Sequence, residues 1–338
     1  MKILFIASRK YDYLQDAIFS GLVKQLGWKN VHTFSFYKNF FLPVKKYPRN
    51  IGYSNQALLS KKLFFNKISQ YDVIILAACK PDAFKDYLSV LPLISIHTKT
   101  VFIDGGDASL IGGDLSRLGQ SNLWNQVNQR PFDYVFKREY LKNEDYPENV
   151  FPCPFAFNYN VIKDIRKSAF IYDVTFWAVE SHPVRTKALN LLSDKFDCQA
   201  NGTTSNQSFY KYKRKGNRYL EELQKAKITL NFRGGGWDTL RYWEVPALGR
   251  FMVSQEPGIV IPNNYEHEKQ AVFVPKDLSN LIEVCDYYLK NEKKREEIAK
   301  RAEIHTKEFH TDIARSKYLL KILNQKIIPS HYSMTNSA

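Results

Sequence analysis

Short, uninterrupted apolar runs recur along the chain, and segments with helical spacing lie between them. The first such segment carries leucine or isoleucine at every fourth position from residue 14 to residue 26. Strands that read as apolar runs rather than as alternations are buried on both faces, which is typical of a parallel sheet covered by helices. We therefore predict an α/β fold. The runs in the first half are KILFIAS (2–8), NVHTFSFY (30–37), YDVIILAA (71–78) and TKTVFID (98–104).

The same alternation restarts near residue 172, after a polar connector. Further strands are predicted in YDVTFWAV (172–179), FDCQANG (196–202), ITLNF (228–232), FMVSQEP (251–257) and AVFVP (271–275). We predict two Rossmann-like domains, 1–160 and 161–308, then a helix at 309–327 that crosses back to the N-terminal domain, and a flexible tail at 328–338. Ligands of open α/β sheets bind beyond the carboxyl ends of the strands, so a central cleft between the domains is the expected site.

Charge and cysteine content restrict the class of protein. Forty-nine Lys and Arg against 34 Asp and Glu give a net charge of +15, which favours anionic partners such as nucleotides, anionic lipid, polyanionic glycans or nucleic acid. No apolar run is long enough to span a bilayer. The start of the chain resembles a buried strand more than a signal peptide. Four dispersed cysteines predict neither zinc nor a disulfide framework, so we expect a cytoplasmic protein.

The segment NFRGGGWDTLRYWEVPALGR, residues 231–250, concentrates the clearest site chemistry. Gly234, Gly235 and Gly236 would let the backbone approach a ligand closely. We interpret Asp238 as the N-cap of a short helix that holds Thr239, Glu244 and Gly249. Arg241 and Glu244, three residues apart, would share one helical face. A phosphate would fit the helix N-terminus and Arg241, and a carboxylate there would accept a ribose diol. The alternative is a surface salt bridge beside a glycine turn.

Here the sequence resembles a family. The segments YLEELQKAKITLNF, LRYWEVPALGRFMVSQEPG, VFVPKDLSNLIEVCDYYLKNEKKREEIAKRA and HTKEFHT resemble the C-terminal half of GT-B glycosyltransferases, in particular the CgeB-like branch of the family 1/4-type enzymes. The resemblance covers residues 170–325. It implies a donor nucleotide sugar bound by the C-terminal domain, with no permanently bound cofactor and no metal, since no metal-bridging DxD motif occurs.

The resemblance also implies roles for individual residues. Glu244 is similar to the family glutamate that holds the ribose. Retaining relatives carry a second acid in an E-x7-E pattern, with seven residues between the two acids; this chain has Gly236 at the first of these positions, so the stereochemical outcome stays open. Arg185 and Arg233 are candidates for the pyrophosphate, with a solvated helix residue as the alternative for Arg185. The turn Glu256 to Gly258 would border the sugar, or is an ordinary turn.

In the first half, FIDGGDASLIGGD places three aspartates among four glycines just beyond a strand. In an inverting enzyme Asp107, or as second choice Asp104, would be the general base that deprotonates the acceptor hydroxyl. Local capping of a glycine-rich turn explains these aspartates equally. Ser8 and Arg9 follow the first strand, where the family has a loop that touches sugar or acceptor.

Two histidines and two basic stretches complete the survey. His305 and His310 are five residues apart, which does not suit shared metal ligation, and we interpret them as structural. The stretch 34–49 mixes phenylalanines with lysines and would contact anionic membrane or pack on the core. The stretch 210–218, YKYKRKGNR, would grip a polyanion or nucleic acid, or is simply solvated.

The sequence thus predicts a metal-independent GT-B glycosyltransferase of polysaccharide biosynthesis, which moves a sugar from a nucleotide-diphosphate sugar to a hydroxyl of a cell-surface polysaccharide or lipid-linked glycan. We expect it in the cytoplasm, with peripheral contact to the inner face of an anionic membrane. Three alternatives stay open: a DNA-modifying glycosyltransferase that acts on a hydroxylated base, a GT-B nucleotide-sugar epimerase, and a non-catalytic nucleotide-sugar-binding module.

Overall fold

The computed structural model describes residues 1–41, 65–162, 165, 167–176, 178, 181–192, 195–196 and 217–325. The chain divides into two compact units. The first comprises Met1–Ala156, Val260–Pro262 and Asp312–Ala338, and the second comprises Phe157–Ile259 and Asn263–Thr311. Several predicted segments lie outside the described residues, among them the C-terminal tail, most of the basic stretch 210–218, and the part of the stretch 34–49 beyond residue 41.

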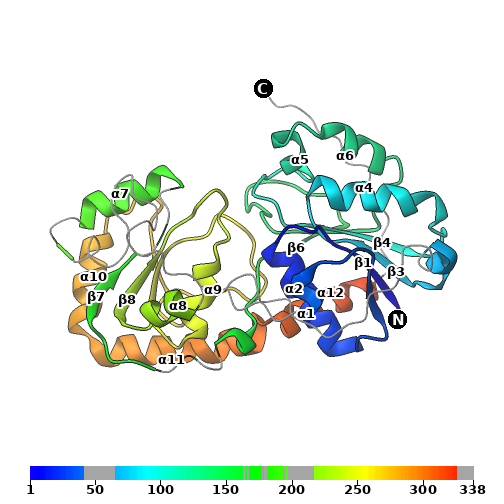
Figure 1. Cartoon of the computed structure of the whole chain (residues 1–338). Coiled ribbons are helices and arrows are strands. Elements are labelled where there is room, and N and C mark those ends of the chain that lie inside the picture. The colour runs from blue at the N-terminus through cyan, green and yellow to red at the C-terminus, as the bar shows by residue number, and fades with distance from the viewer. Residues whose placement is uncertain are drawn as a thin grey trace. The chain divides into compact units, whose positions relative to one another are not determined.

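The first unit is built on a six-stranded, all-parallel sheet in the order β2-β1-β3-β4-β5-β6. Helices α1, α2 and α12 cover one face, and α4, α5 and α6 cover the other (Figure 1). The strands are β1 (Ile3–Ile6), β2 (Val31–Thr33), β3 (Val73–Leu76), β4 (Lys99–Asp104), β5 (Tyr134–Lys137) and β6 (Val150–Pro152). The helices are α1 (Tyr13–Leu26), α2 (Lys38–Phe41), α4 (Pro81–Val90), α5 (Gly113–Arg117), α6 (Ser121–Val127) and α12 (Asp312–Leu323). Single 3₁₀ turns occur at η1 (Ile68–Gln70) and η2 (Leu91–Leu93) in this unit, and at η3 (Tyr159–Val161) in the second unit.

Helix α1 begins where the sequence provides a cap. The carboxylate of Asp12 accepts hydrogen bonds from the backbone N–H groups of Leu14 and Gln15. Two of the N–H groups that every helix leaves unpaired at its start are thereby satisfied. The leucine and isoleucine positions predicted by the four-residue spacing face the core between α1 and the sheet, where Leu14, Ile18 and Leu22 are fully buried.

The second unit carries a four-stranded, all-parallel sheet in the order β10-β9-β8-β7. Its strands are β7 (Tyr172–Thr175), β8 (Ala226–Asn231), β9 (Met252–Gln255) and β10 (Val272–Val274). Its helices are α7 (Pro183–Leu192), α8 (Asn217–Leu223), α9 (Leu240–Ala247), α10 (Leu281–Lys290) and α11 (Glu292–Phe309) (Figure 1). A core of aliphatic and aromatic side chains from strands and helices fills this unit. The predicted α/β fold with parallel sheets is confirmed. The predicted strand at 196–202 lies almost wholly outside the described residues.

Candidate functional site

The loop between β8 and α9 holds the three glycines at the carboxyl edge of the second sheet. Its two ends are tied together, because the Thr239 hydroxyl donates to Asn231 Oδ1 at 2.6 Å and Asn231 Nδ2 donates to Ser254 Oγ at 3.0 Å. Within the loop, the N–H of Gly234 donates to the carbonyl oxygen of Gly236 at 2.9 Å. The strand end therefore positions both the glycine turn and the start of α9.

Two buried guanidinium groups lie beside this loop. Arg185 on α7 and Arg241 on α9 are each only 7% exposed, and both stack on Phe176, with 5.9 Å and 5.4 Å from guanidinium carbon to ring centroid. Burial and the positive charge of Arg241 lower the pKa of Arg185 to about 9. Like charges removed from water destabilise each other, so this pair favours the binding of an anion.

Arg185 is held by the backbone that leads into the glycines. Its Nε donates to the carbonyl oxygen of Arg233 at 2.8 Å, and its Nη2 donates to that of Phe232 at 3.0 Å. Its Nη1 donates to Ser181 Oγ at 3.2 Å. A Cβ added to Gly234 would lie 3.0 Å from Arg185 Nη2, tighter than ordinary van der Waals contact. Glycine thus allows the loop to approach the guanidinium, and the predicted residues Arg185 and Gly234 lie together.

Glu244 lies one helical turn beyond Arg241 and is 1% exposed. The hydroxyl of Tyr219, on α8, donates to Glu244 Oε2 at 2.8 Å. Burial and the Glu244 charge raise the pKa of Tyr219. The sequence analysis missed Tyr219, because its bond to Glu244 joins residues 25 positions apart and no periodic pattern records such a contact.

The predicted N-cap at Asp238 is wrong. Helix α9 starts at Leu240, and Thr239 is its N-cap, with extended φ −116° and ψ 146° and no side-chain cap bond. Asp238 instead accepts a hydrogen bond from the buried indole N–H of Trp243 at 2.8 Å, because a buried donor without a partner is costly. The predicted helix end is confirmed, since Gly249 adopts the left-handed φ of 64° just beyond α9.

Arg233 packs against an aromatic side chain that the sequence analysis did not single out. Its guanidinium carbon lies 4.4 Å from the ring centroid of Trp237, and Lys276 Nζ lies 5.7 Å from the same centroid. A Cβ on Gly258 would fall 2.7 Å from the Trp237 ring, so the predicted turn at 256–258 needs glycine to seat that indole. Arg233, Lys276 and the turn at 256–258 therefore all lie around the Trp237 ring.

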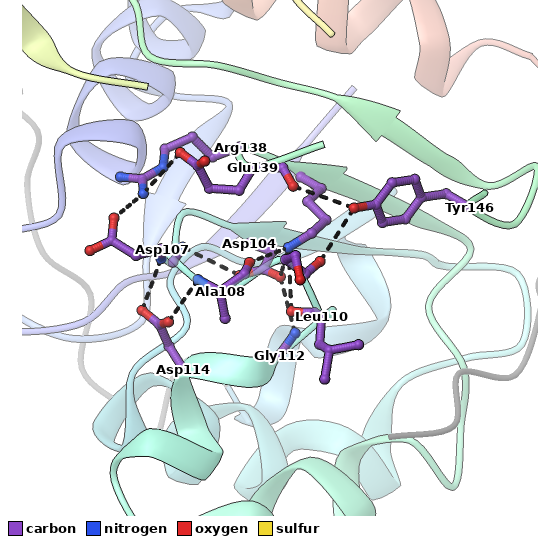
Figure 2. Close-up of polar contacts among 12 residues, drawn as sticks. Asp104, Asp107, Ala108, Leu110, Gly112, Asp114, Arg138, Glu139 and Tyr146 are labelled. Atoms are coloured by element: carbon purple, nitrogen blue, oxygen red, sulfur yellow. Dashed lines mark hydrogen bonds and ion pairs between the residues drawn. The ribbon is translucent and has the colours of Figure 1, made fainter. Parts of the chain in front are cut away.

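The carboxyl edge of the first sheet holds the predicted catalytic aspartates (Figure 2). Asp104, at the end of β4, is buried and paired with Lys137 Nζ at 3.1 Å. Its carboxylate also accepts the N–H groups of Gly112 at 3.0 Å and Gly106 at 3.3 Å. Lys137 Nζ in turn donates to the carbonyl oxygen of Ala108 at 2.9 Å. These bonds fix the turn after β4.

Asp107 has a different environment three residues later. Its side chain is 45% exposed and forms an ion pair with Arg138 (Figure 2). The Arg138 guanidinium stacks 4.6 Å from the Phe155 ring centroid. Arg138 also lies 3.3 Å from the carboxylate of Glu139. The backbone N–H of Asp107 donates to Asp114 at 3.2 Å. Asp114 is therefore a local cap, and Asp107 is the aspartate of the three whose carboxylate reaches solvent most.

The remaining candidates make contacts within their own units. Ser8 Oγ donates to Asp82 at 2.8 Å, and Arg9 pairs with Asp86 at 2.6 Å, which ties the loop after β1 to α4. The Nε2 atoms of His305 and His310 lie 2.7 Å and 2.9 Å from a single acceptor, the carbonyl oxygen of Asn263. Within the described residues, no group of three His, Cys, Asp or Glu side chains is arranged to hold a metal ion.

The family comparison identifies the part of the chain that carries the resemblance. A family model described as "Glycosyl transferase-like" matches residues 186–321, which include α9, Arg241 and Glu244. No curated protein matches the chain.

Comparison with solved structures identifies the fold over nearly the whole chain. HepE of Anabaena, solved with UDP-glucose, superposes with a TM-score of 0.59 at 13% identity, covering 96% of this chain and 99% of HepE. The fold is GT-B. Residues 186–321 match the glycosyl transferase-like family model, and the predicted enzyme class, a glycosyltransferase, is confirmed.

Two further structures share the fold. An alpha-glucosyltransferase solved with UDP and a 13-mer DNA containing an HMU base gives a TM-score of 0.57 at 11% identity, covering 96% of this chain and 100% of that one. Sucrose-phosphate synthase of Thermosynechococcus elongatus gives 0.56 at 8% identity, covering 96% and 99%. Among the described residues, no helix is both long and apolar enough to cross a membrane.

Proposed function

We propose that this glycosyltransferase moves a sugar from a nucleoside-diphosphate sugar to a hydroxyl of a cell-surface polysaccharide or lipid-linked glycan. The observation that carries the proposal is the pair of buried guanidiniums, Arg185 on α7 and Arg241 on α9, with the buried carboxylate of Glu244 one helical turn beyond Arg241. Positive charge with a carboxylate beside it matches a diphosphate linked to a ribose diol. HepE, which has this fold, was solved with UDP-glucose.

The cationic groups of the site would bind the diphosphate of the donor, and the carboxylate would bind its ribose. Arg185, Arg241 and Arg233, with the backbone N–H groups of Gly235 and Gly236, would bind the diphosphate, whereas the predicted Gly234 N–H already donates to the Gly236 carbonyl oxygen. The N-terminal end of α9 adds the favourable end of its helix dipole. Glu244 would accept hydrogen bonds from the ribose hydroxyls. Asp238, already bonded to Trp243, would support α9 rather than touch the donor.

The same cations would serve the chemical step. As the bond between the sugar C1 and the diphosphate oxygen breaks, negative charge grows on the leaving diphosphate. Fixed guanidiniums in a buried site stabilise that charge without reorganising. In an inverting reaction Asp107 would take the proton of the acceptor hydroxyl while its oxygen bonds to C1. Asp104, paired with Lys137, would hold the loop that carries Asp107.

Thermal unfolding with nucleotides tests the proposal. We expect millimolar UDP-glucose or another nucleotide sugar to raise the Tm by several degrees, since a ligand at 100 times its Kd stabilises by about 2.7 kcal/mol. Arg241→Gln should remove most of this stabilisation. Arg250→Gln is the matched control, because Arg250 also stacks on a ring, Phe170 at 4.7 Å, and donates to a carbonyl, that of Ser168 at 2.9 Å. The proposal fails if no nucleotide or nucleotide sugar of a full panel shifts the Tm.

A DNA acceptor is the second candidate. A neighbour with the same fold was solved with DNA containing an HMU base, and the net charge of +15 favours polyanions. The same charge supports the proposed peripheral contact with anionic membrane and does not distinguish the two. The donor half of the reaction would be unchanged, so only the acceptor differs.

A further inference from the structure

We propose that Tyr11 and Tyr13, supported by Phe155, form an aromatic platform on which a pyranose ring of a glycan acceptor stacks beside Asp107. The inference rests on the proposed function and deepens it, because it commits the acceptor to a carbohydrate and assigns the side chains that bind it. All four residues belong to the first unit.

The platform is a chain of aromatic contacts that ends at Tyr11, which is 43% exposed. The ring centroids of Tyr11 and Tyr13 lie 5.5 Å apart at an interplanar angle of 33°, and those of Tyr13 and Phe155 lie 5.8 Å apart at 74°. Phe155 is buried, and the buried Arg315 donates from Nη2 to its carbonyl oxygen at 3.2 Å. An exposed ring backed by fixed rings is preorganised to bind an apolar ligand face.

Two contacts place this platform beside the loop that carries Asp107. The Arg138 guanidinium lies 4.6 Å from the Phe155 ring centroid and pairs with Asp107 (Figure 2). Asp12 lies between the two tyrosines in the sequence, and a Cβ added to Gly105 would fall 2.9 Å from its Oδ1. Glycine thus lets the loop after β4 approach the tyrosine segment closely. A ligand on the platform would lie near the carboxylate proposed to take the acceptor proton.

The backbone under the platform is fixed by the start of α1. The Asp12 carboxylate accepts the N–H groups of Leu14 and Gln15, each at 3.1 Å. The side-chain oxygen of Gln15 accepts the N–H of Ser8 at 2.7 Å, which ties the end of β1 to the same helix. Because these bonds already hold the segment, little conformational entropy is lost when a ligand binds to it.

A pyranose fits this arrangement better than a nucleobase does. The C–H groups on one face of a pyranose pack against the negative face of an aromatic ring, while the hydroxyls at its edge stay available for charged partners. Asp107 and Arg138 supply such partners beside the platform. A nucleobase is held flat between aromatic or apolar side chains or in a stack of bases. The angles of 33° and 74° between successive rings would not continue such a stack.

Saturation-transfer NMR tests the platform directly, because it reports which ligand protons touch the protein. The probes are the methyl glycosides of glucose, galactose, mannose and N-acetylglucosamine, with 5-hydroxymethyl-2′-deoxyuridine as the nucleobase probe. We expect the ring C–H protons of at least one glycoside to receive saturation from the wild type. Tyr11→Ala should raise the Kd of that glycoside about tenfold, and Tyr11→Phe, which keeps the ring, should leave it within about twofold.

Trp28→Ala is the matched control. Trp28 is also an exposed aromatic residue, 51% exposed, and it lies beyond the opposite end of α1. Its removal should leave glycoside affinity unchanged, which separates the platform from adhesion of sugars to any exposed ring. Tyr11→Phe separates loss of stacking from loss of folding, and thermal unfolding of each variant measures the latter.

The inference is overturned if no glycoside binds, if Tyr11→Ala binds as tightly as the wild type, or if Trp28→Ala weakens binding equally. Saturation of the nucleobase protons alone, lost in Tyr11→Ala, would also overturn it and would assign the platform to a DNA acceptor. None of these outcomes bears on donor binding, which the Tm shift with nucleotide sugars measures separately. The proposed function fails in that second measurement, when no nucleotide or nucleotide sugar shifts the Tm.

Discussion

Asp104 is buried, whereas Asp107, three residues later, is exposed to solvent. Asp104 is the buried counter-ion of Lys137, whose side chain is fully buried. We predict that Asp104→Asn lowers the free energy of unfolding by about 3–5 kcal/mol, the usual cost of leaving a buried charge unpaired. Asp107 is 45% exposed. Its partner Arg138 also lies near the Glu139 carboxylate, so Arg138 retains an acidic neighbour when the Asp107 charge is removed. Asp107→Asn should therefore change stability little but slow sugar transfer about 10²- to 10⁴-fold.

Denaturant unfolding and transfer assays on both variants check this prediction. Asp173→Asn is the control for a surface pair: Asp173 is exposed, lies 2.8 Å from Lys227, and should cost less than about 1 kcal/mol. Nucleotide binding should survive Asp107→Asn. Full transfer activity in that variant would remove Asp107 from the catalytic step, and a stable Asp104→Asn protein would contradict the buried ion pair.

Residue types and local spacing predicted part of the site but not its contacts. The glycines, Arg241 and Glu244 lie within one segment, so a strand-to-helix reading was enough to group them. Arg185 lies 48 residues before Arg233 in the sequence, and its bond to the Arg233 carbonyl oxygen holds it beside the glycine loop. Tyr219 and Arg138 gave no local signal. Asp238 was misread because the cap preference of Asp was considered without the indole of Trp243, whose buried N–H needs an acceptor.

At the scale of elements, the contact between α1 and α12 depends on a glycine. A Cβ on Gly21 would lie 2.7 Å from the carbonyl carbon of Asp312 and closer still to its oxygen. Asp312 also accepts from Ser20 Oγ at 2.7 Å and Lys24 Nζ at 2.6 Å, so it cannot simply move away. We predict that Gly21→Ala destabilises the first unit by about 1–3 kcal/mol or more, although alanine favours helix.

Thermal unfolding compares this variant with Gly27→Ala at the end of the same helix. Gly27 has φ of 78° and ψ of 153°, a region essentially confined to glycine, and no heavy atom lies within 4 Å of an added Cβ, so backbone strain alone, about 1–3 kcal/mol, opposes alanine there. If Gly21→Ala is as stable as the wild type, the two helices do not pack as closely as the structure shows.

The sequence predicted the positions of strands better than it predicted the order of the strands in the sheet. Runs such as Val73–Leu76 predicted strands because every residue in them is buried on a covered sheet. The order β2-β1-β3 was not predicted, since pairing depends on which helices pack on each face and not on the strand residues themselves. The N-cap of helix α9 lies one residue later than predicted, at Thr239 instead of Asp238, because tertiary hydrogen bonds at Thr239 and Asp238 outweigh local preference.

At the scale of the whole molecule, the net charge of +15 governs encounter with polyanions rather than the chemistry of transfer. Sequence-independent binding to duplex DNA is therefore expected at low salt from charge alone. A protein that contacts 6–10 phosphates loses about 10³- to 10⁵-fold in affinity between 50 and 200 mM salt. Affinity at one salt concentration consequently does not identify the acceptor.

The acceptor can be identified from how DNA affinity changes with salt concentration and with modification of the base. With a glycan or lipid-linked acceptor, we predict that duplex binding becomes weaker than a Kd of about 10⁻⁶ M at physiological salt, which is the non-specific range. It should be equal for unmodified and hydroxymethylated DNA, with no sugar incorporated into either. Fluorescence anisotropy over a salt series, paired with transfer of labelled sugar, measures both. Tight binding that persists at physiological salt, prefers the hydroxylated base and leads to glucosylated DNA would instead make DNA the acceptor, because charge alone discriminates neither base nor product.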